Sequence, residues 1–453
     1  MAKDKLTDYS ATNASNTDIG GINIDEGMLP SAVNNALREL LTHLKEFSDG
    51  TSGIDVLSLA DDDASAAMKL QAPASVTSDT TLTLPDGDGD SGQTLITNGS
   101  GTLAWAAPYG NRNLIINGAM QVAQRGTSST SLGYQTVDRF NVHKNGSFDQ
   151  LAFTQAQVTD APAGFSNSYK FTTTTAETTV DADESIGIRT ALEGQDLQQL
   201  GYGTGSAKKL TLSFYVKSSQ TGTFAIYFYS ADTVRIITRT YTISSANTWE
   251  QKSVTIDGDA SGSIDNDANE SLQISWAIAA GSNFTSSDST SWSAYSNAKL
   301  YYDHAQNAVL TTTNATWQIT GVQLELGEQA TPFEHRSFGD ELIKCQRYYS
   351  QYDSTNGGWV GSGFFYNTTA VEVTIRLPQR MRAAPTVSIG GTENHIAIQR
   401  AATSNAGATS SSAGNVRTVA YKFATTADGS STTGNGTNLY VQNTAILKHD
   451  AEL

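Results

Sequence analysis

The chain has 453 residues, with a formal net charge of −17 and only 28 Lys and Arg. This acidic balance argues against nucleic acid as a partner, because phosphate backbones are bound by clusters of Lys and Arg. The single cysteine, Cys345, excludes an intrachain disulfide and a Cys-rich zinc site, and we expect it to be buried. The sequence contains no cofactor motif, no secretion signal at its start and no apolar run long enough for a membrane span.

Residues 1–27 are polar, so we expect them to become ordered only against a partner. A helix is predicted at 30–47, with Pro30 in its first turn and Gly50 after its end. Its apolar residues alternate spacings of four and three, as in a coiled-coil seam: Val33, Leu37, Leu40, Leu44 and Phe47, widened by Leu41. The helix could pack on its own domain instead. Since no sizeable core lies nearby in sequence, self-association is favoured.

Residues 51–110 are predicted to form a fibrous β shaft or neck. Short apolar runs are separated here by the turn sequences DGDGDSG and NGSG. Such short strands cannot bury an apolar face alone, whereas several chains side by side can. Asp86, Asp88 and Asp90 are compatible with a calcium loop, but DG pairs favour a plain turn.

Residues 111–337 are predicted to form a large jelly-roll-like β-sandwich, because short strands alternate with Gly, Asn and Ser turns. In the last strand Gly321 interrupts the apolar alternation, which indicates a bulge or a close backbone approach. The predicted strands are 113–116, 210–218, 223–229, 235–243, 250–256, 271–278 and 317–326. The fold class is therefore mainly β, with one N-terminal helix.

Residues 338–453 are predicted to form a smaller C-terminal β-sandwich, with a short helix at 340–349 and a strand at 372–377. Two loops rich in Ser, Thr, Gly and Asn, 402–415 and 426–438, are candidates for a binding surface. His395 and Arg400, just before the first loop, are further receptor-binding candidates.

The segment 257–270, DGDASGSIDNDANE, partly follows the spacing of a calcium loop through Asp257, Asp259 and Asp265. Ala268 stands where that loop needs Glu, and a strand rather than a helix precedes it, so no metal is expected. The chain has no G-x-S-x-G or H-E-x-x-H motif, and its six histidines share no local spacing. We therefore expect no enzyme, although a glycosidase needs only two well-placed carboxylates.

Aromatic residues fall into two groups. Trp276 and Trp317 lie in predicted strands and are expected in the core. Four others lie in the long polar stretch 282–314 and are candidates for stacking on sugar rings: Trp292, Tyr295, Tyr301 and Tyr302. The alternative is that this stretch folds back onto its own sandwich.

Several motifs in order resemble a β-sandwich module of bacteriophage tail and fibre proteins. They are NLIINGAMQVAQRG at 113–126, DRF at 138–140, LSFYVKSS at 212–219 and TWEQKSVTI at 248–256. The module ends with GVQLELG at 321–327, ATPFE at 330–334, Arg336 and a segment closing in CQRYY at 345–349. The segments 81–105 and 380–389 resemble strand-turn-strand pieces of the same proteins.

This resemblance implies a homotrimeric tail fibre on the virion, released by lysis, with domains 1–50, 51–110, 111–337 and 338–453. Residues 1–27 would attach to a tail adaptor or nozzle protein, and the distal β domains would recognise a host surface glycan or outer-membrane component. The alternatives are a structural head or collar fibre or decoration protein and, in a different class, a polysaccharide-degrading tailspike.

Overall fold

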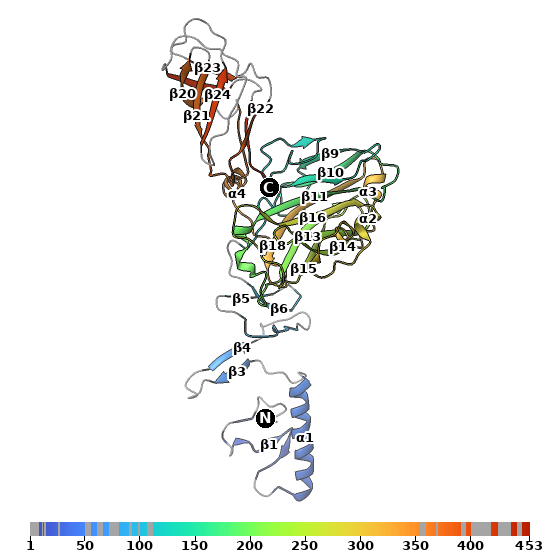
Figure 1. Ribbon diagram of the computed structural model, residues 1–453. Helices are drawn as coiled ribbons and strands as arrows, with labels where there is room; N and C mark the ends of the chain where they lie inside the picture. The colour runs from blue at the N-terminus through green and yellow to red at the C-terminus, as the bar shows by residue number, and fades with distance from the viewer. Residues whose placement is uncertain are drawn as a thin grey trace. The chain divides into compact units, whose positions relative to one another are not determined.

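The computed structural model describes residues 9–10, 12, 15–25, 28–49, 56–60, 67–71, 81–89, 93–97, 100–106, 112–353, 359–367, 370–390, 396–399, 418–424, 436–441 and 446–453. The chain separates into two compact units, Met1–Thr83 and Leu84–Leu453. The fold is mainly β with few helices, as predicted (Figure 1). No helix in the described ranges is long and apolar enough to cross a membrane.

The first unit is built around the predicted helix, which extends over α1 (Pro30–Asp49). A small hairpin of β1 (Asp18–Ile19) and β2 (Ile22–Asn23) contacts one flank of α1. Ala36 and His43 are buried on this flank, and the Tyr9 hydroxyl lies 2.9 Å from His43 Nδ1. A second hairpin pairs β3 (Val56–Ala60) with β4 (Ala67–Gln71).

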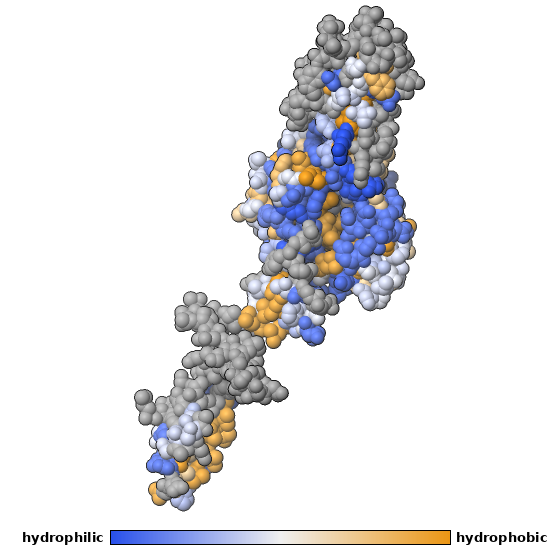
Figure 2. All heavy atoms as spheres, turned by 90° about the vertical axis from the view of Figure 1, so that its left-hand side faces the viewer, coloured by the Kyte–Doolittle hydropathy of each residue, from blue (hydrophilic) through white to orange (hydrophobic). Residues whose placement is uncertain are grey.

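The rest of the apolar face of α1 is exposed. Leu37 is 56% exposed and Leu41 64%, with Val33 and Leu44 beside them, and hydrophobic atoms gather along one side of this unit in Figure 2. Leu40 is half-buried, so Leu41 is a larger part of the exposed stripe than the heptad spacing indicated. Phe47 belongs to α1, but its side chain lies outside the described residues.

The second unit begins with a neck hairpin and continues into a sandwich of two six-stranded antiparallel sheets (Figure 1). The hairpin pairs β5 (Thr94–Thr97) with β6 (Leu103–Ala106). The first sheet has the order β15 (Glu250–Ile256), β12 (Leu210–Ser218), β18 (Thr316–Leu326), β10 (Ser168–Thr175), β9 (Ala152–Val158) and β7 (Ser128–Ser129). The second has the order β17 (Ser293–Ala294), β14 (Arg235–Ile243), β13 (Gly222–Ser230), β16 (Glu270–Ala280), β11 (Ser185–Glu193) and β8 (Asn141–Asn145).

The core lies between the two sheets. Alternate residues of facing strands enter it, as the period of two in a strand requires, and Phe214, Trp276 and Trp317 are fully buried there. This confirms the core positions predicted for both tryptophans. Six of the predicted strands are present within a residue or two of their bounds, whereas 113–116 is not a strand.

Residues 282–314 cover the outer face of the second sheet. This stretch contains α2 (Ser282–Thr285), η5 (Asn297–Lys299) and α3 (Ala308–Thr311). Two further short helices, η3 (Gly194–Asp196) and η4 (Gln198–Leu200), lie elsewhere, directly after β11. A second apolar cluster forms beneath it, in which Tyr301 and Phe284 pack against Tyr227 and Ile236. The stretch therefore folds back onto its sandwich.

The terminal module begins with α4 (Phe338–Gln346), where Ser337 caps the helix and Cys345 is buried as predicted. A three-stranded sheet has the order β19 (Tyr349–Asp353), β26 (Ile446–Asp450) and β22 (Thr386–Gly390). A five-stranded sheet has the order β23 (Ile396–Gln399), β25 (Gly436–Val441), β20 (Trp359–Asn367), β21 (Ala370–Arg376) and β24 (Thr418–Ala424). The loop 402–415 and most of 426–438 lie outside the described residues.

Two buried arginines connect this module to the sandwich. Arg125 stacks 3.6 Å from the Tyr349 ring and pairs with Asp450 at 3.0 Å. Arg139 stacks 3.5 Å from the Tyr348 ring and pairs with Glu452. Opposite charges and aromatic faces together offset the cost of burying two guanidinium groups.

Candidate functional site

The outer face of the first sheet is polar and only partly covered. Leu212, Phe214 and Val216 of β12 point into the core, so Ser213 and Tyr215 lie on the outer face. The register places Tyr215 opposite Gln251 of β15 on one side and Thr320 of β18 on the other.

Gly321 opens this face at the predicted bulge. The register between β12 and β18 shifts here, and Gly321 has a φ of 61°, a backbone conformation that favours glycine. A Cβ atom at this position would lie 2.7 Å from the Phe165 ring and 3.0 Å from Tyr215. Glycine therefore lets two aromatic rings approach the strand backbone.

A strap formed by residues 328–336 folds back over β18. The Glu325 carboxylate accepts hydrogen bonds from Thr331 N (2.8 Å) and Thr331 Oγ1 (2.6 Å). Gln323 Oε1 accepts from Glu334 N at 2.8 Å. The polar residues of GVQLELG thus hold the ATPFE segment in place, which gives this motif a structural reason.

The end of the strap is held by Arg336 and Asn113. Arg336 donates to the carbonyl oxygens of Asn113 and Ile115, and Asn113 N donates to Glu334 Oε2 at 2.7 Å. Ile115 N donates to the Asn113 side chain at 2.9 Å. These side chains occupy backbone groups that a strand ladder would use, and this explains why the strand predicted at 113–116 is wrong.

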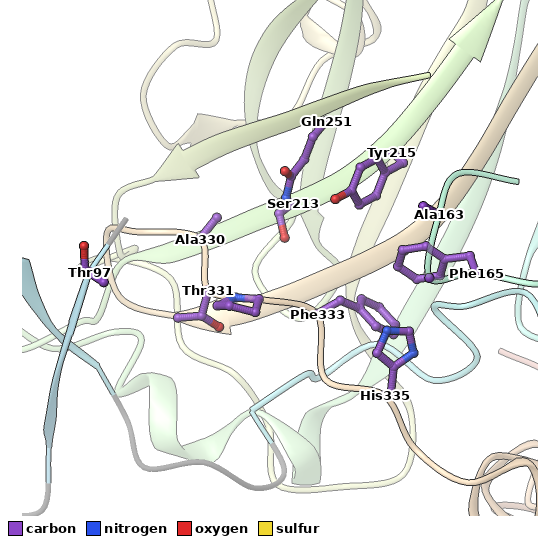
Figure 3. Close-up of a pocket in the computed structure, with 13 residues that line it drawn as sticks. Thr97, Ala163, Phe165, Ser213, Tyr215, Gln251, Ala330, Thr331, Phe333 and His335 are labelled. Atoms are coloured by element: carbon purple, nitrogen blue, oxygen red, sulfur yellow. The ribbon is translucent and has the colours of Figure 1, made fainter. Parts of the chain in front are cut away.

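Four rings gather where the strap meets the loop between β9 and β10. The Phe165 centroid lies 5.5 Å from Tyr215, 5.0 Å from Phe333 and 5.2 Å from His335. Phe333 and His335 are edge-to-face at 4.9 Å. Figure 3 shows Phe165, Phe333 and His335 at one end of a pocket of about 590 Å³.

The polar part of the pocket comes from the sheet. In Figure 3, Ser213, Tyr215 and Gln251 face the space between the strands and the strap. Across the part of the chain that the structure describes, these three side chains have no hydrogen-bond partner. No carboxylate, Lys or Arg belongs to the described residues that line the pocket. The pocket therefore offers aromatic faces and free hydroxyl and amide groups without a net charge, apart from the His335 imidazole.

Trp249 lies on the same face, two residues before Gln251. Its ring is 5.2 Å from Lys217 Nζ, and its Nε1 lies 3.4 Å from Asp160 Oδ1. Lys217 also pairs with Asp160 and lowers the pKa of that carboxyl by hydrogen bonding to it. The two charges beside Trp249 thus neutralise each other.

The structure places the aromatic residues predicted for binding elsewhere, around the second sheet. Tyr301 is fully buried, with its hydroxyl 2.9 Å from Ser275 Oγ, so its assignment as a receptor-binding residue is wrong. Trp292 packs against the core and donates to Asp257 O at 2.7 Å. Tyr295 is half-buried and packs edge-to-face on Tyr229.

The remaining predicted binding residues do not reach the pocket either. Tyr302 is half-buried and does not line it. His395 and Arg400 lie outside the described residues.

The three carboxylates of the partial calcium motif have different partners. Asp259 is 2% exposed and accepts from Arg235 Nε at 2.6 Å. Asp257 lies 3.5 Å from Lys209, whereas Asp265 is exposed. No group of three or more His, Cys, Asp or Glu side chains suited to a metal occurs in the described ranges.

Sequence reasoning missed Phe165, Phe333 and His335. Phe333 and His335 lie within and beside the motif ATPFE, so a search for aromatic residues next to the closing strand would have found them. Phe165 carries no such signal, because its partner in the pocket is more than 150 residues away in the chain.

Comparisons with known proteins give distant similarities only. No protein-family model and no curated protein matches the chain. A tailspike protein 4 domain of Bacteriophage CBA120 aligns at 12% identity and a TM-score of 0.27, over 48% of this chain and 21% of that one. A family 11 carbohydrate-binding module of Clostridium thermocellum aligns at 13% identity and a TM-score of 0.24, over 45% and 98%. A putative sugar binding protein from Bacteroides thetaiotaomicron aligns at 14% and 0.26, over 48% and 100%. None is similar enough to indicate what this chain binds.

Proposed function

We propose that this chain is a homotrimeric phage tail fibre that binds a host surface glycan through the outer face of its large sandwich, without cleaving it. The observation that carries the proposal is the pocket beneath the strap. Aromatic faces beside unpaired hydroxyl and amide groups match the two surfaces of a sugar ring, one apolar and one rich in hydroxyls. No carboxylate is among the described residues that line the pocket, whereas glycoside hydrolysis uses a pair of them.

The first unit supports assembly into a trimer. Val33, Leu37, Leu41 and Leu44 expose a continuous apolar stripe that a second and a third copy of α1 would cover. Leu82, Leu84 and Leu95, at the neck, are exposed as well. In this proposal residues 1–27 attach to a tail adaptor or nozzle protein, and three copies of the pocket act together on one cell.

The test compares binding of the full chain to bacteria that adsorb the virion. Phe165→Ala and Phe333→Ala combined should lower cell binding at least about tenfold, because stacking faces are lost. Tyr302→Ala removes an aromatic residue away from the pocket and should bind as the unaltered chain does. Equal binding by the double variant would contradict the site. Release of reducing sugar from the cells would contradict the non-enzymatic part.

A further inference from the structure

We infer that the ligand of this face is a neutral, linear oligosaccharide that extends from the pocket onto Trp249; this rests on the proposed glycan function. The lining of the pocket indicates a neutral ligand. No Lys, Arg, Asp or Glu is among the described residues that line the pocket, and the chain as a whole carries −17. A sugar acid would meet no compensating cation in the pocket and an unfavourable long-range field.

The outward side chains of β12 and β15 lie in rows across the sheet. Tyr215 pairs with Gln251 in the row of the pocket, and Lys217 lies two residues further along β12, on the same face. Trp249 adjoins Lys217, as their contact of 5.2 Å shows. Two residues of a strand span about 6.6 Å, so an aromatic ring is available roughly one row beyond the pocket.

The surroundings of Trp249 are neutral as well. Trp249 is half-buried and keeps part of its surface open. Its neighbours Lys217 and Asp160 pair with each other, and Gln318 Nε2 lies 3.3 Å from Asp160 Oδ2. This leaves the open part of the Trp249 ring next to a carboxylate whose charge is already paired. It suits a second uncharged sugar ring rather than a sulfated or carboxylated one.

The loop between β9 and β10 contributes both to the pocket and to the surroundings of Trp249. Asp160 holds the Trp249 end, and Phe165 forms the aromatic end of the pocket. A chain of sugars lying along this loop would contact both, whereas a single ring would contact only one. The geometry therefore selects for length as well as for neutrality.

The experiment measures binding of the full chain to matched linear probes by calorimetry. The probes are glucose, galactose and mannose, their neutral hexasaccharides, and the same hexasaccharides with C6 oxidised to the carboxylate. At least one neutral hexasaccharide should bind, at least about tenfold tighter than its oxidised counterpart. Trp249→Ala should weaken the hexasaccharide several-fold and leave the monosaccharide unchanged, while Phe165→Ala should weaken both. Tyr302→Ala should change neither, and thermal unfolding confirms that each variant is folded.

Each outcome decides the inference. Equal or tighter binding of oxidised probes, equal effects of Trp249→Ala on both lengths, or no binding of any neutral hexasaccharide would overturn it. If Phe165→Ala and Phe333→Ala still abolish cell binding in that case, the proposed function stands and only the ligand class is wrong. If cell binding is unaffected by them, the proposed function itself fails.

Discussion

The helix α1 exposes much of its apolar face, whereas the large sandwich buries most of its apolar side chains. Among the described residues, most exposed large apolar side chains precede residue 96, including Leu37, Leu41 and Leu44. In the sandwich most large apolar residues are buried, and the partly covered outer face of the first sheet carries polar groups with a few rings. The sandwich thus completes its core within one chain, whereas α1 leaves an apolar stripe exposed.

The difference indicates that the two regions have different roles. Burying one Leu side chain contributes roughly 1.5–3 kcal/mol, so an exposed stripe of this kind is a strong source of association energy. The outer face of the first sheet offers much less apolar area, but its pocket presents specific polar groups and rings, as a ligand site does. Assembly is therefore expected from the first unit and recognition from the second.

The largest effect is expected from breaking assembly. Leu37→Asp puts a charge on the exposed stripe, which a single chain tolerates and an apolar interface does not. Binding to a glycan-coated surface should fall about 10²–10⁴-fold as avidity is lost, while the affinity for a soluble oligosaccharide stays unchanged. Surface plasmon resonance measures the first quantity and calorimetry the second. Asn34→Asp, a charge off the stripe, is the control. Unchanged surface binding by Leu37→Asp would argue that α1 does not assemble the chain.

The next largest effect is expected from a cavity in the sandwich. Phe214 is fully buried between the sheets, so Phe214→Ala should lower the free energy of unfolding by about 3–5 kcal/mol. Denaturant titration measures this change, and the oligomer mass should be unaltered. Leu132→Ala, at an exposed position, should change stability by less than about 0.5 kcal/mol. A loss of assembly in folded Phe214→Ala would contradict the separation of the two regions.

Acid should destabilise the sandwich through buried histidines. Burial lowers the pKa of His143 to about 3 and that of His304 to about 4. Below pH 6.5 these imidazoles are protonated in the unfolded chain but stay neutral in the folded chain. The free energy of unfolding therefore falls with pH until the pH reaches the folded pKa values. By pH 5 each imidazole should lower the free energy of unfolding by about 2 kcal/mol, because one pKa unit corresponds to 1.36 kcal/mol.

Asp138 opposes this trend, because burial raises its pKa to about 6 and the folded state then gains a proton as the pH falls through that value. The Asp138→Asn variant should therefore lose stability more steeply between pH 6 and 4. Unfolding midpoints in urea across this range measure how steeply stability changes with pH in the unaltered chain and in Asp138→Asn. A sandwich transition that is flat or rises toward pH 5 would be inconsistent with neutral buried imidazoles.

The smallest effect is expected at Gly321. Gly321→Ala and Gly327→Ala both place a side chain at positive φ, at a cost of about 1–2 kcal/mol. Only the new Cβ atom of Gly321→Ala would also contact Phe165, since nothing lies within 4 Å of a Cβ atom at Gly327. Saccharide affinity should therefore fall for Gly321→Ala and stay constant for Gly327→Ala. Equal affinities would show that the bulge does not position Phe165.

Strands with clear alternation were predictable from sequence. The bounds of β12, β14 and β15 match the prediction, because apolar residues alternate there between turn residues. By contrast β9 and β10 place the polar residues Gln155 and Thr173 on their buried face, which interrupts the apolar alternation in the sequence. Residues 113–116 have strand-like composition, but side chains from the strap occupy their backbone groups.

The candidate site was harder to predict than the fold. Tyr301 lies in a long stretch with many polar residues, 282–314. Its partners, such as Ala225 and Tyr227, come from the outward positions of a strand whose other side faces the core. Phe165 and Phe333 are separated by most of the sandwich, so only the folded chain shows that their rings meet. Local patterns indicate elements, whereas a site made by two loops depends on the topology.

The most direct test of the whole account is the mass of the intact chain in solution. Sedimentation equilibrium at micromolar concentration measures it without any variant. If α1 joins copies of the chain and the sandwich is left free to bind, the mass should be three times 48.1 kDa. A stable monomer of 48.1 kDa at that concentration would contradict the account.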